Sequence, residues 1–182
     1  LAESLGTPID LLGHSMGGKA SLMATLTRPD LIRKLIVADI APVSYSHTQM
    51  MYIDAMRGID LSNLERRSQA EAALRAVIDD PILPSFFTQS LDLKAKRWKL
   101  NLDTLAQEMQ AILSFPEVTG HFTGPTLFLT GATSSYVLPE HRERIKAVFP
   151  KAKFAKIPGA GHWLHAEKPA EFEAAVRHFL AA

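Results

Sequence analysis

Residues 9–20 read IDLLGHSMGGKA, and this stretch decides the fold class of the chain. The apolar run at its start is typical of a buried strand, and it leads straight into residues 13–17, which fit the pattern G-x-S-x-G. Apolar residues then recur at helical spacing from Leu22 onward. Strand, sharp turn and helix in this order predict a nucleophile elbow, in which the turn strains Ser15 and projects its Oγ above the sheet edge. The glycines on either side of Ser15 are expected to let strand and helix backbones approach closely.

The composition excludes several classes of function. The chain has 182 residues and a formal net charge of +1, which gives no electrostatic case for binding nucleic acid or an anionic membrane. No apolar run approaches the roughly 18 residues of a membrane span. There are no cysteines, so disulfides, thiolate catalysis and Cys-based zinc sites are excluded. A cysteine-free chain suits a reducing compartment, and we expect a cytoplasmic location.

The rest of the chain predicts an α/β fold with an insertion. The apolar run 33–40 follows the elbow helix closely, which predicts a β-α-β unit and a parallel strand pair. Residues 44–120 have the pattern of helices without clear strands, and we interpret them as a helical cap. Further strands are expected at 125–131 and 152–157. We therefore predict a parallel sheet flanked by helices, built from residues 1–43 and 121–182, with the cap inserted between them.

A serine nucleophile needs a base to accept its proton. Ligands of an open parallel sheet bind beyond the carboxyl ends of its strands, so the base is expected in a loop that follows a strand. His162 lies in the glycine-rich loop after the last expected strand, and we predict that it is the base. His165 is the alternative. No histidine pair has metal-ligand spacing with a carboxylate, so we predict no metal site.

The base in turn needs a carboxylate that holds its tautomer. The loop at 131–135 is the usual place for this acid, but it holds no Asp or Glu. Asp39 ends the strand beside the elbow strand, at the same edge of the sheet. We predict Asp39 as the acid, with a helix cap as its other interpretation and Glu140 as the fallback.

Ser15, Asp39 and His162 follow one another in the order Ser…Asp…His, and this constellation resembles the α/β-hydrolase superfamily. Residues 13–20 (GHSMGGKA) and 159–169 (GAGHWLHAEKP) are similar more narrowly to the YbfF-type bacterial esterases. The resemblance runs from residue 7 to the C-terminus. Because the family's N-terminal strands and a His-Gly loop with one oxyanion donor have no counterpart, we expect the chain to begin inside the fold. The Met16 backbone N–H is then the remaining oxyanion donor.

The resemblance implies hydrolysis of carboxylic esters or thioesters of short to medium acyl chains, without a cofactor. The partner expected is therefore a small acyl ester or thioester, while the oligomeric state is left open. His14, Tyr45, Tyr136 and Trp163 are the predicted substrate-binding residues. An apolar wall is expected from cap residues, namely Met50, Met51, Met56, Phe86 and Phe87. Two alternatives stay open: a hydrolase of carbon–carbon bonds or lactones with this fold, and an inert ligand-binding fragment.

Overall fold

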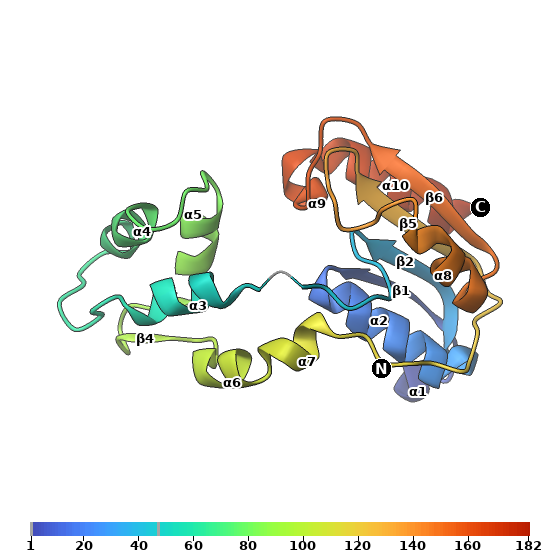
Figure 1. Cartoon of the computed structure of the whole chain (residues 1–182), viewed down its shortest axis with the longest axis horizontal. Helices are drawn as coiled ribbons and strands as arrows, with labels where there is room; N and C mark the ends of the chain where they lie inside the picture. The colour runs from blue at the N-terminus through green and yellow to red at the C-terminus, as the bar shows by residue number, and fades with distance from the viewer. Residues whose placement is uncertain (1, 47) are drawn as a thin grey trace. The chain divides into compact units, whose positions relative to one another are not determined.

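A computed structural model describes residues 2–46 and 48–182, and it divides the chain into two compact units (Figure 1). Leu1–Val43 and Phe115–Ala182 form the first, which we call the sheet unit. Ser44–Ser114 form the second, the helical unit. Residues 115–120, which we expected at the end of the cap, thus pack with the sheet unit. Leu1 and His47 lie outside the described residues.

The sheet unit contains a parallel four-stranded sheet in the order β1-β2-β5-β6 (Figure 1). The strands are β1 (Ile9–His14), β2 (Ile32–Ala38), β5 (Thr126–Gly131) and β6 (Ala152–Ile157). The helices of this unit are α1 (Ala2–Leu5), α2 (Met16–Thr27), the 3₁₀ turn η1 (Pro29–Leu31), α8 (His141–Val148), α9 (Leu164–Glu167) and α10 (Pro169–Ala181). The predicted fold class, a parallel sheet flanked by helices, is confirmed.

The two faces of the sheet carry different apolar clusters, because successive strand side chains alternate in direction. On one face, Ile36, Leu127 and Ile157 pack with Phe179 of α10 in a buried core. On the other, the ring of Phe128 lies 6.1 Å from that of Phe149, the residue after α8. Helices therefore cover both faces, and this leaves the carboxyl ends of the strands open for a site.

The helical unit holds five helices among the residues that the structure describes. They are α3 (Met50–Arg57), α4 (Arg67–Arg75), α5 (Leu83–Thr88), α6 (Leu102–Gln107) and α7 (Met109–Leu113). The expectation of a cap without strands is wrong in one place, where β3 (Leu91–Asp92) and β4 (Arg97–Trp98) form an antiparallel pair. Strands of two residues are too short to produce an alternating pattern in the sequence. A hydrogen bond ties this strand pair to α3, since Trp98 Nε1 donates to the carbonyl of Met56 at 2.9 Å.

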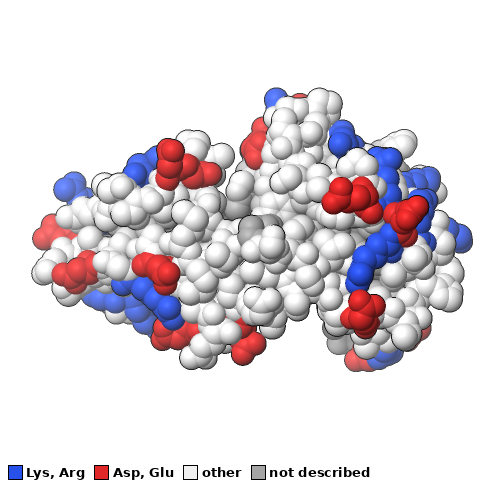
Figure 2. All heavy atoms as spheres, viewed as in Figure 1, with Lys and Arg blue, Asp and Glu red and all other residues white. Residues whose placement is uncertain are grey.

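Among the described residues, no helix has the length and apolar character that crossing a membrane requires. On the face drawn in Figure 2, basic and acidic side chains are interspersed over each unit. Ion pairs at the surface of the protein include Arg177 with Glu173 and Arg75 with Glu71. Pairs of this kind contribute little to stability.

Candidate active site

The turn between β1 and α2 has the strained geometry that the sequence predicts for an elbow. Ser15 has φ 53° and ψ −120°, a left-handed conformation that non-glycine residues rarely adopt. Its N–H donates to the carbonyl of Ala38 in the neighbouring strand, at 3.0 Å. This bond fixes the turn against β2.

Only one of the two glycines flanking Ser15 is required by close packing. A Cβ at Gly13 would lie 2.3 Å from the carbonyl oxygen of Gly17, whereas a Cβ at Gly17 would meet nothing within 4 Å. The second close contact comes from Gly18, where a Cβ would lie 2.5 Å from the Ile40 side chain. The expectation about flanking glycines is therefore right for Gly13 and wrong for Gly17, whose place at the helix–sheet contact is taken by Gly18.

Asp39 immediately follows β2 and is fully buried, with an exposed fraction of 0%. It also adopts a left-handed backbone conformation, with φ 52°. Oδ1 accepts the Gly131 N–H at 3.1 Å, and Oδ2 accepts the Ser134 hydroxyl at 2.5 Å. Since a buried carboxylate is costly unless it is hydrogen-bonded, these donors stabilise the charge.

His162 connects the nucleophile with the acid. Its Nδ1 lies 2.8 Å from Asp39 Oδ2, and its Nε2 lies 3.0 Å from Ser15 Oγ. A carboxylate only accepts hydrogen bonds, so Nδ1 carries the proton and the lone pair of Nε2 faces the hydroxyl. The structure thus brings together the three residues predicted as nucleophile, base and acid, which lie up to 147 positions apart.

The loop after β5 has a function that the sequence analysis missed. It contains no carboxylate, but its Ser134, together with Gly131 at the end of β5, donates to the carboxylate of Asp39. Thr133 from the same loop donates through Oγ1 to the carbonyl of Ala160, in the His162 loop, at 2.9 Å. A search for hydrogen-bond donors as well as acids in this loop could have found Ser134. The fallback acid Glu140 is exposed at the N-cap of α8.

Three histidines and a tryptophan form a cluster beside this site. The ring of His14 lies 4.8 Å from that of His162, 4.6 Å from that of His165 and 5.5 Å from that of Trp163. Burial lowers the pKa of His14 to about 4, and burial is also the main cause that lowers the pKa of His165. Both rings are therefore neutral at neutral pH. The position between serine and acid is held by the ring of His162, the predicted base, and not by the alternative His165.

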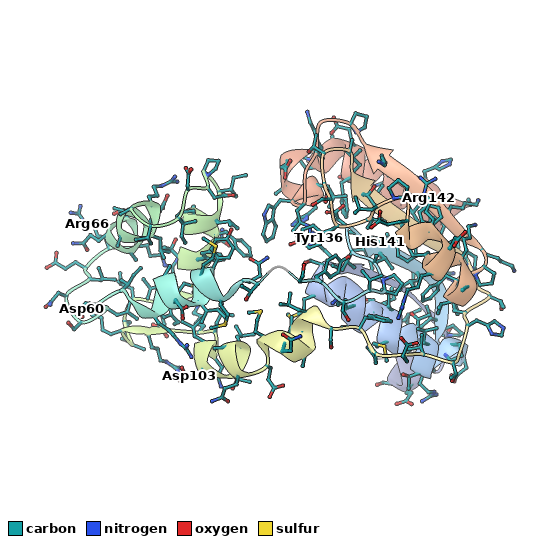
Figure 3. The ribbon with its side chains drawn as sticks, viewed as in Figure 1. Asp60, Arg66, Asp103, Tyr136, His141 and Arg142 are labelled. Carbon is teal, nitrogen blue, oxygen red and sulfur yellow. The ribbon has the colours of Figure 1, made fainter. Side chains whose placement is uncertain are left out.

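Tyr136 comes from the loop between β5 and α8 (Figure 3). Its ring stacks on the imidazole of His162, with centroids 3.9 Å apart and an interplanar angle of 16°. Of the residues predicted to bind substrate, His14, Tyr136 and Trp163 therefore lie against the predicted base. Met16 is the first residue of α2, so its N–H has no acceptor within the helix.

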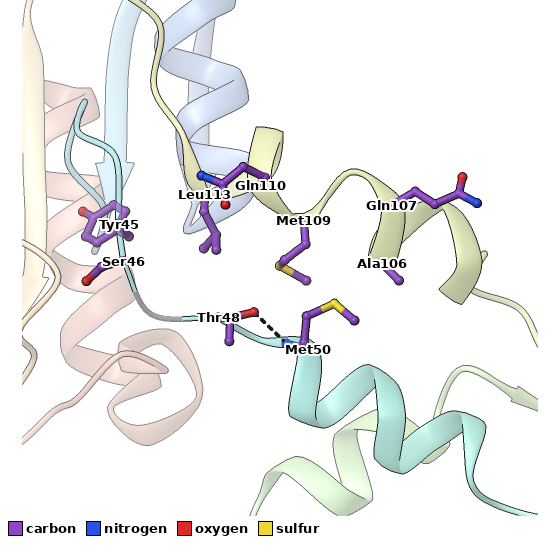
Figure 4. A pocket seen from close by; sticks show the side chains of 9 residues that line it. All are labelled: Tyr45, Ser46, Thr48, Met50, Ala106, Gln107, Met109, Gln110 and Leu113. Atoms are coloured by element: carbon purple, nitrogen blue, oxygen red, sulfur yellow. Dashed lines mark hydrogen bonds between the residues drawn. The ribbon is translucent and has the colours of Figure 1, made fainter.

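The helical unit contains a cavity of about 510 Å³ (Figure 4). Its lining includes uncharged polar residues and apolar ones, namely Tyr45, Ser46, Thr48, Met50, Ala106, Gln107, Met109, Gln110 and Leu113. Of the expected apolar wall, only Met50 lines this cavity. Met56 is buried in the core of the unit, whereas Met51 and Phe86 are exposed.

Across residues 2–46 and 48–182, no group of three or more His, Asp or Glu side chains is arranged to hold a metal ion. The groups at the site are instead one hydroxyl, one imidazole and one carboxylate in hydrogen-bond contact. This set can remove a proton from the hydroxyl and return it without a further group.

Comparison with known proteins gives the following matches. The model of the alpha/beta hydrolase family matches residues 1–175. The mouse sn-1-specific diacylglycerol lipase ABHD11 is 40% identical over 190 residues, covering 100% of this chain and 62% of its own length. Esterase YbfF of Escherichia coli K12 is 34% identical over 172 residues, covering 93% of this chain and 66% of its own length. This chain is therefore shorter than either relative.

Among solved structures, one titled marine microorganism esterase superposes with a TM-score of 0.90 at 36% identity. The match covers 98% of this chain and 75% of the other. Because it includes nearly every residue, it covers both the sheet unit and the helical unit.

Proposed function

Because this chain belongs to the alpha/beta hydrolase family, we propose that it is a serine hydrolase of carboxylic esters or thioesters. The observation that carries the proposal is the continuous line of hydrogen bonds from Ser15 Oγ through His162 to Asp39, at 3.0 and 2.8 Å. Relatives named as an esterase and a diacylglycerol lipase support an ester as the bond cleaved.

The proposed reaction proceeds through an acyl-enzyme. Ser15 Oγ attacks the carbonyl carbon while Nε2 of His162 accepts its proton, and the Met16 N–H stabilises the oxyanion. Collapse of this intermediate breaks the ester bond, and His162 returns the proton to the leaving alcohol or thiol. Water, deprotonated by the same nitrogen, then attacks the acyl group. As this second intermediate collapses and the acid leaves, His162 returns the proton to Ser15 Oγ. Throughout, Asp39 holds the Nδ1–H of the ring and stabilises the imidazolium.

For the substrate we propose an uncharged acyl chain of short to medium length. The rings of Tyr136 and Trp163 support this, because both are uncharged and lie beside the imidazole of His162. The cysteine-free composition supports a reducing, cytoplasmic location.

Labelling with a fluorophosphonate tests the nucleophile. The proposal expects one covalent adduct, mapped to Ser15 by peptide mass spectrometry, and none in Ser15→Ala. An unlabelled protein, or an adduct on another serine, contradicts it. Hydrolysis of p-nitrophenyl esters of graded chain length, with a lactone panel beside them, then separates an esterase from a lactonase of the same fold.

A further inference from the structure

The main chain on both sides of His162 is held by a single carboxylate. Glu167, the last residue of α9, accepts the Gly161 N–H on Oε2 at 2.7 Å and the Trp163 N–H on Oε1 at 3.1 Å. One side chain therefore binds the N–H groups of the two residues on either side of His162. Hydrogen bonds to an ionised acceptor are stronger than those between neutral groups.

The carbonyl of His162 itself is held from another direction. His14 Nε2 lies 2.8 Å from this oxygen, and since a carbonyl only accepts, the Nε2–H of His14 donates. His14 directly precedes Ser15 in the chain, so this bond ties the segment that carries the serine to the segment that carries His162. The low pKa of His14, about 4, keeps the ring neutral, so it adds no positive charge beside His162.

We propose that His14 and Glu167 are positioning residues, which together hold the main chain at His162 so that Nε2 stays within hydrogen-bond distance of Ser15 Oγ. The inference rests on the proposed function of Ser15 and His162. The His162 loop needs such support, because it contains Gly159 and Gly161, and Gly159 adopts a left-handed φ of 69°. Without these bonds, the backbone freedom of the two glycines would let the imidazole turn away from the hydroxyl.

Two substitutions at His14 separate hydrogen bonding from packing. His14→Gln keeps an amide N–H at similar reach and removes the ring, whereas His14→Phe keeps a ring and removes the donor. If the donated hydrogen bond positions His162, His14→Phe should lower kcat on the order of tenfold, the factor that one neutral hydrogen bond supplies, and leave KM unchanged. The kcat of His14→Gln should then stay close to that of the wild type. If the ring matters only for packing, the order of the two variants is reversed, and that order overturns the inference.

Glu167→Gln keeps one acceptor oxygen but turns an NH₂ group toward a backbone N–H. We expect kcat and the rate of fluorophosphonate labelling of Ser15 to fall on the order of tenfold, again with KM unchanged. Glu171→Gln, on the exposed surface of α10, is the matched control and keeps wild-type values. Wild-type rates in Glu167→Gln overturn the role of this residue. If the wild-type protein itself is not labelled, the proposed function fails rather than the inference built on it.

Discussion

Asp39→Asn is a direct test of the acid, because the substitution should leave the fold intact. Asp39 is fully buried and has φ 52°, a conformation that asparagine tolerates better than most residues. Asparagine also matches aspartate in shape. Alanine at this position would add backbone strain and a cavity, so a loss of activity in that variant would have several causes.

The hydrogen bonds around Asp39 determine how an amide must orient there. The Gly131 N–H points at Oδ1, so the amide oxygen of asparagine takes that place and its NH₂ takes the place of Oδ2. The NH₂ then faces Nδ1 of His162, which must give up its proton and accept. The proton moves to Nε2, where it faces Ser15 Oγ and leaves no lone pair to act as base.

We therefore expect Asp39→Asn to lower kcat about 10⁴-fold, the loss associated with a wrong histidine tautomer, which corresponds to about 5 kcal/mol of transition-state stabilisation. KM should change little, because the carboxylate is too deeply buried to contact substrate. The assay is steady-state hydrolysis of a p-nitrophenyl ester, with circular dichroism as the check on folding. Glu140→Gln, which alters the exposed fallback acid, serves as the control and should match the wild type.

A variant Asp39→Asn that retains kcat within tenfold of the wild type would refute this reasoning. A collapse of activity in Glu140→Gln would do the same, since it would move the acid to the N-cap of α8. A folded but slow Asp39→Asn beside a normal Glu140→Gln is the expected pair of results.

Three further predictions concern the residues around the triad. Ser134→Ala removes one hydrogen-bond donor from the Asp39 carboxylate, and we expect kcat to fall on the order of tenfold in the same ester assay. An unchanged kcat would show that the Ser134 hydroxyl does not help to hold the acid. Gly13→Ala should destabilise the protein by about 2 kcal/mol or more, because the added Cβ would lie 2.3 Å from the Gly17 carbonyl oxygen. Gly17→Ala, in the open first turn of α2, should instead stabilise the protein by roughly 0.5–1 kcal/mol. Urea unfolding measures both variants, and equal losses of stability would contradict the packing argument. The pKa of His14 in the folded protein is about 4, below its ordinary value of 6.5. Between these two pH values the unfolded chain therefore binds more protons than the folded protein. The free energy of unfolding should fall by roughly 2–3 kcal/mol as the pH drops from 6.5 to 4. In His14→Gln this part of the pH dependence should disappear from unfolding curves measured at both ends of the range.

Local patterns in the sequence were sufficient to predict the sheet of the first unit. Apolar runs predicted β2 and β5 to within a few residues, because buried parallel strands need continuous apolar sequence. A weaker alternating pattern predicted β6, whose Lys153 and Lys156 are exposed. The helical unit was less predictable. Its two-residue strands are held by contacts such as the Trp98–Met56 hydrogen bond, which join residues 42 positions apart and leave no local pattern.

By itself, the sequence predicted the elbow at Ser15 and favoured His162 and Asp39 over His165 and Glu140, because the carboxyl ends of neighbouring parallel strands lie at the same edge of the sheet. Only the tertiary structure decided what holds these groups in place: Ser134 on the acid, and His14 and Glu167 on the main chain of His162. The reason is physical. Periodicity encodes which side of a strand or helix is buried, whereas a hydrogen bond between two loops depends on strand register and loop conformation, which form only when distant segments pack together.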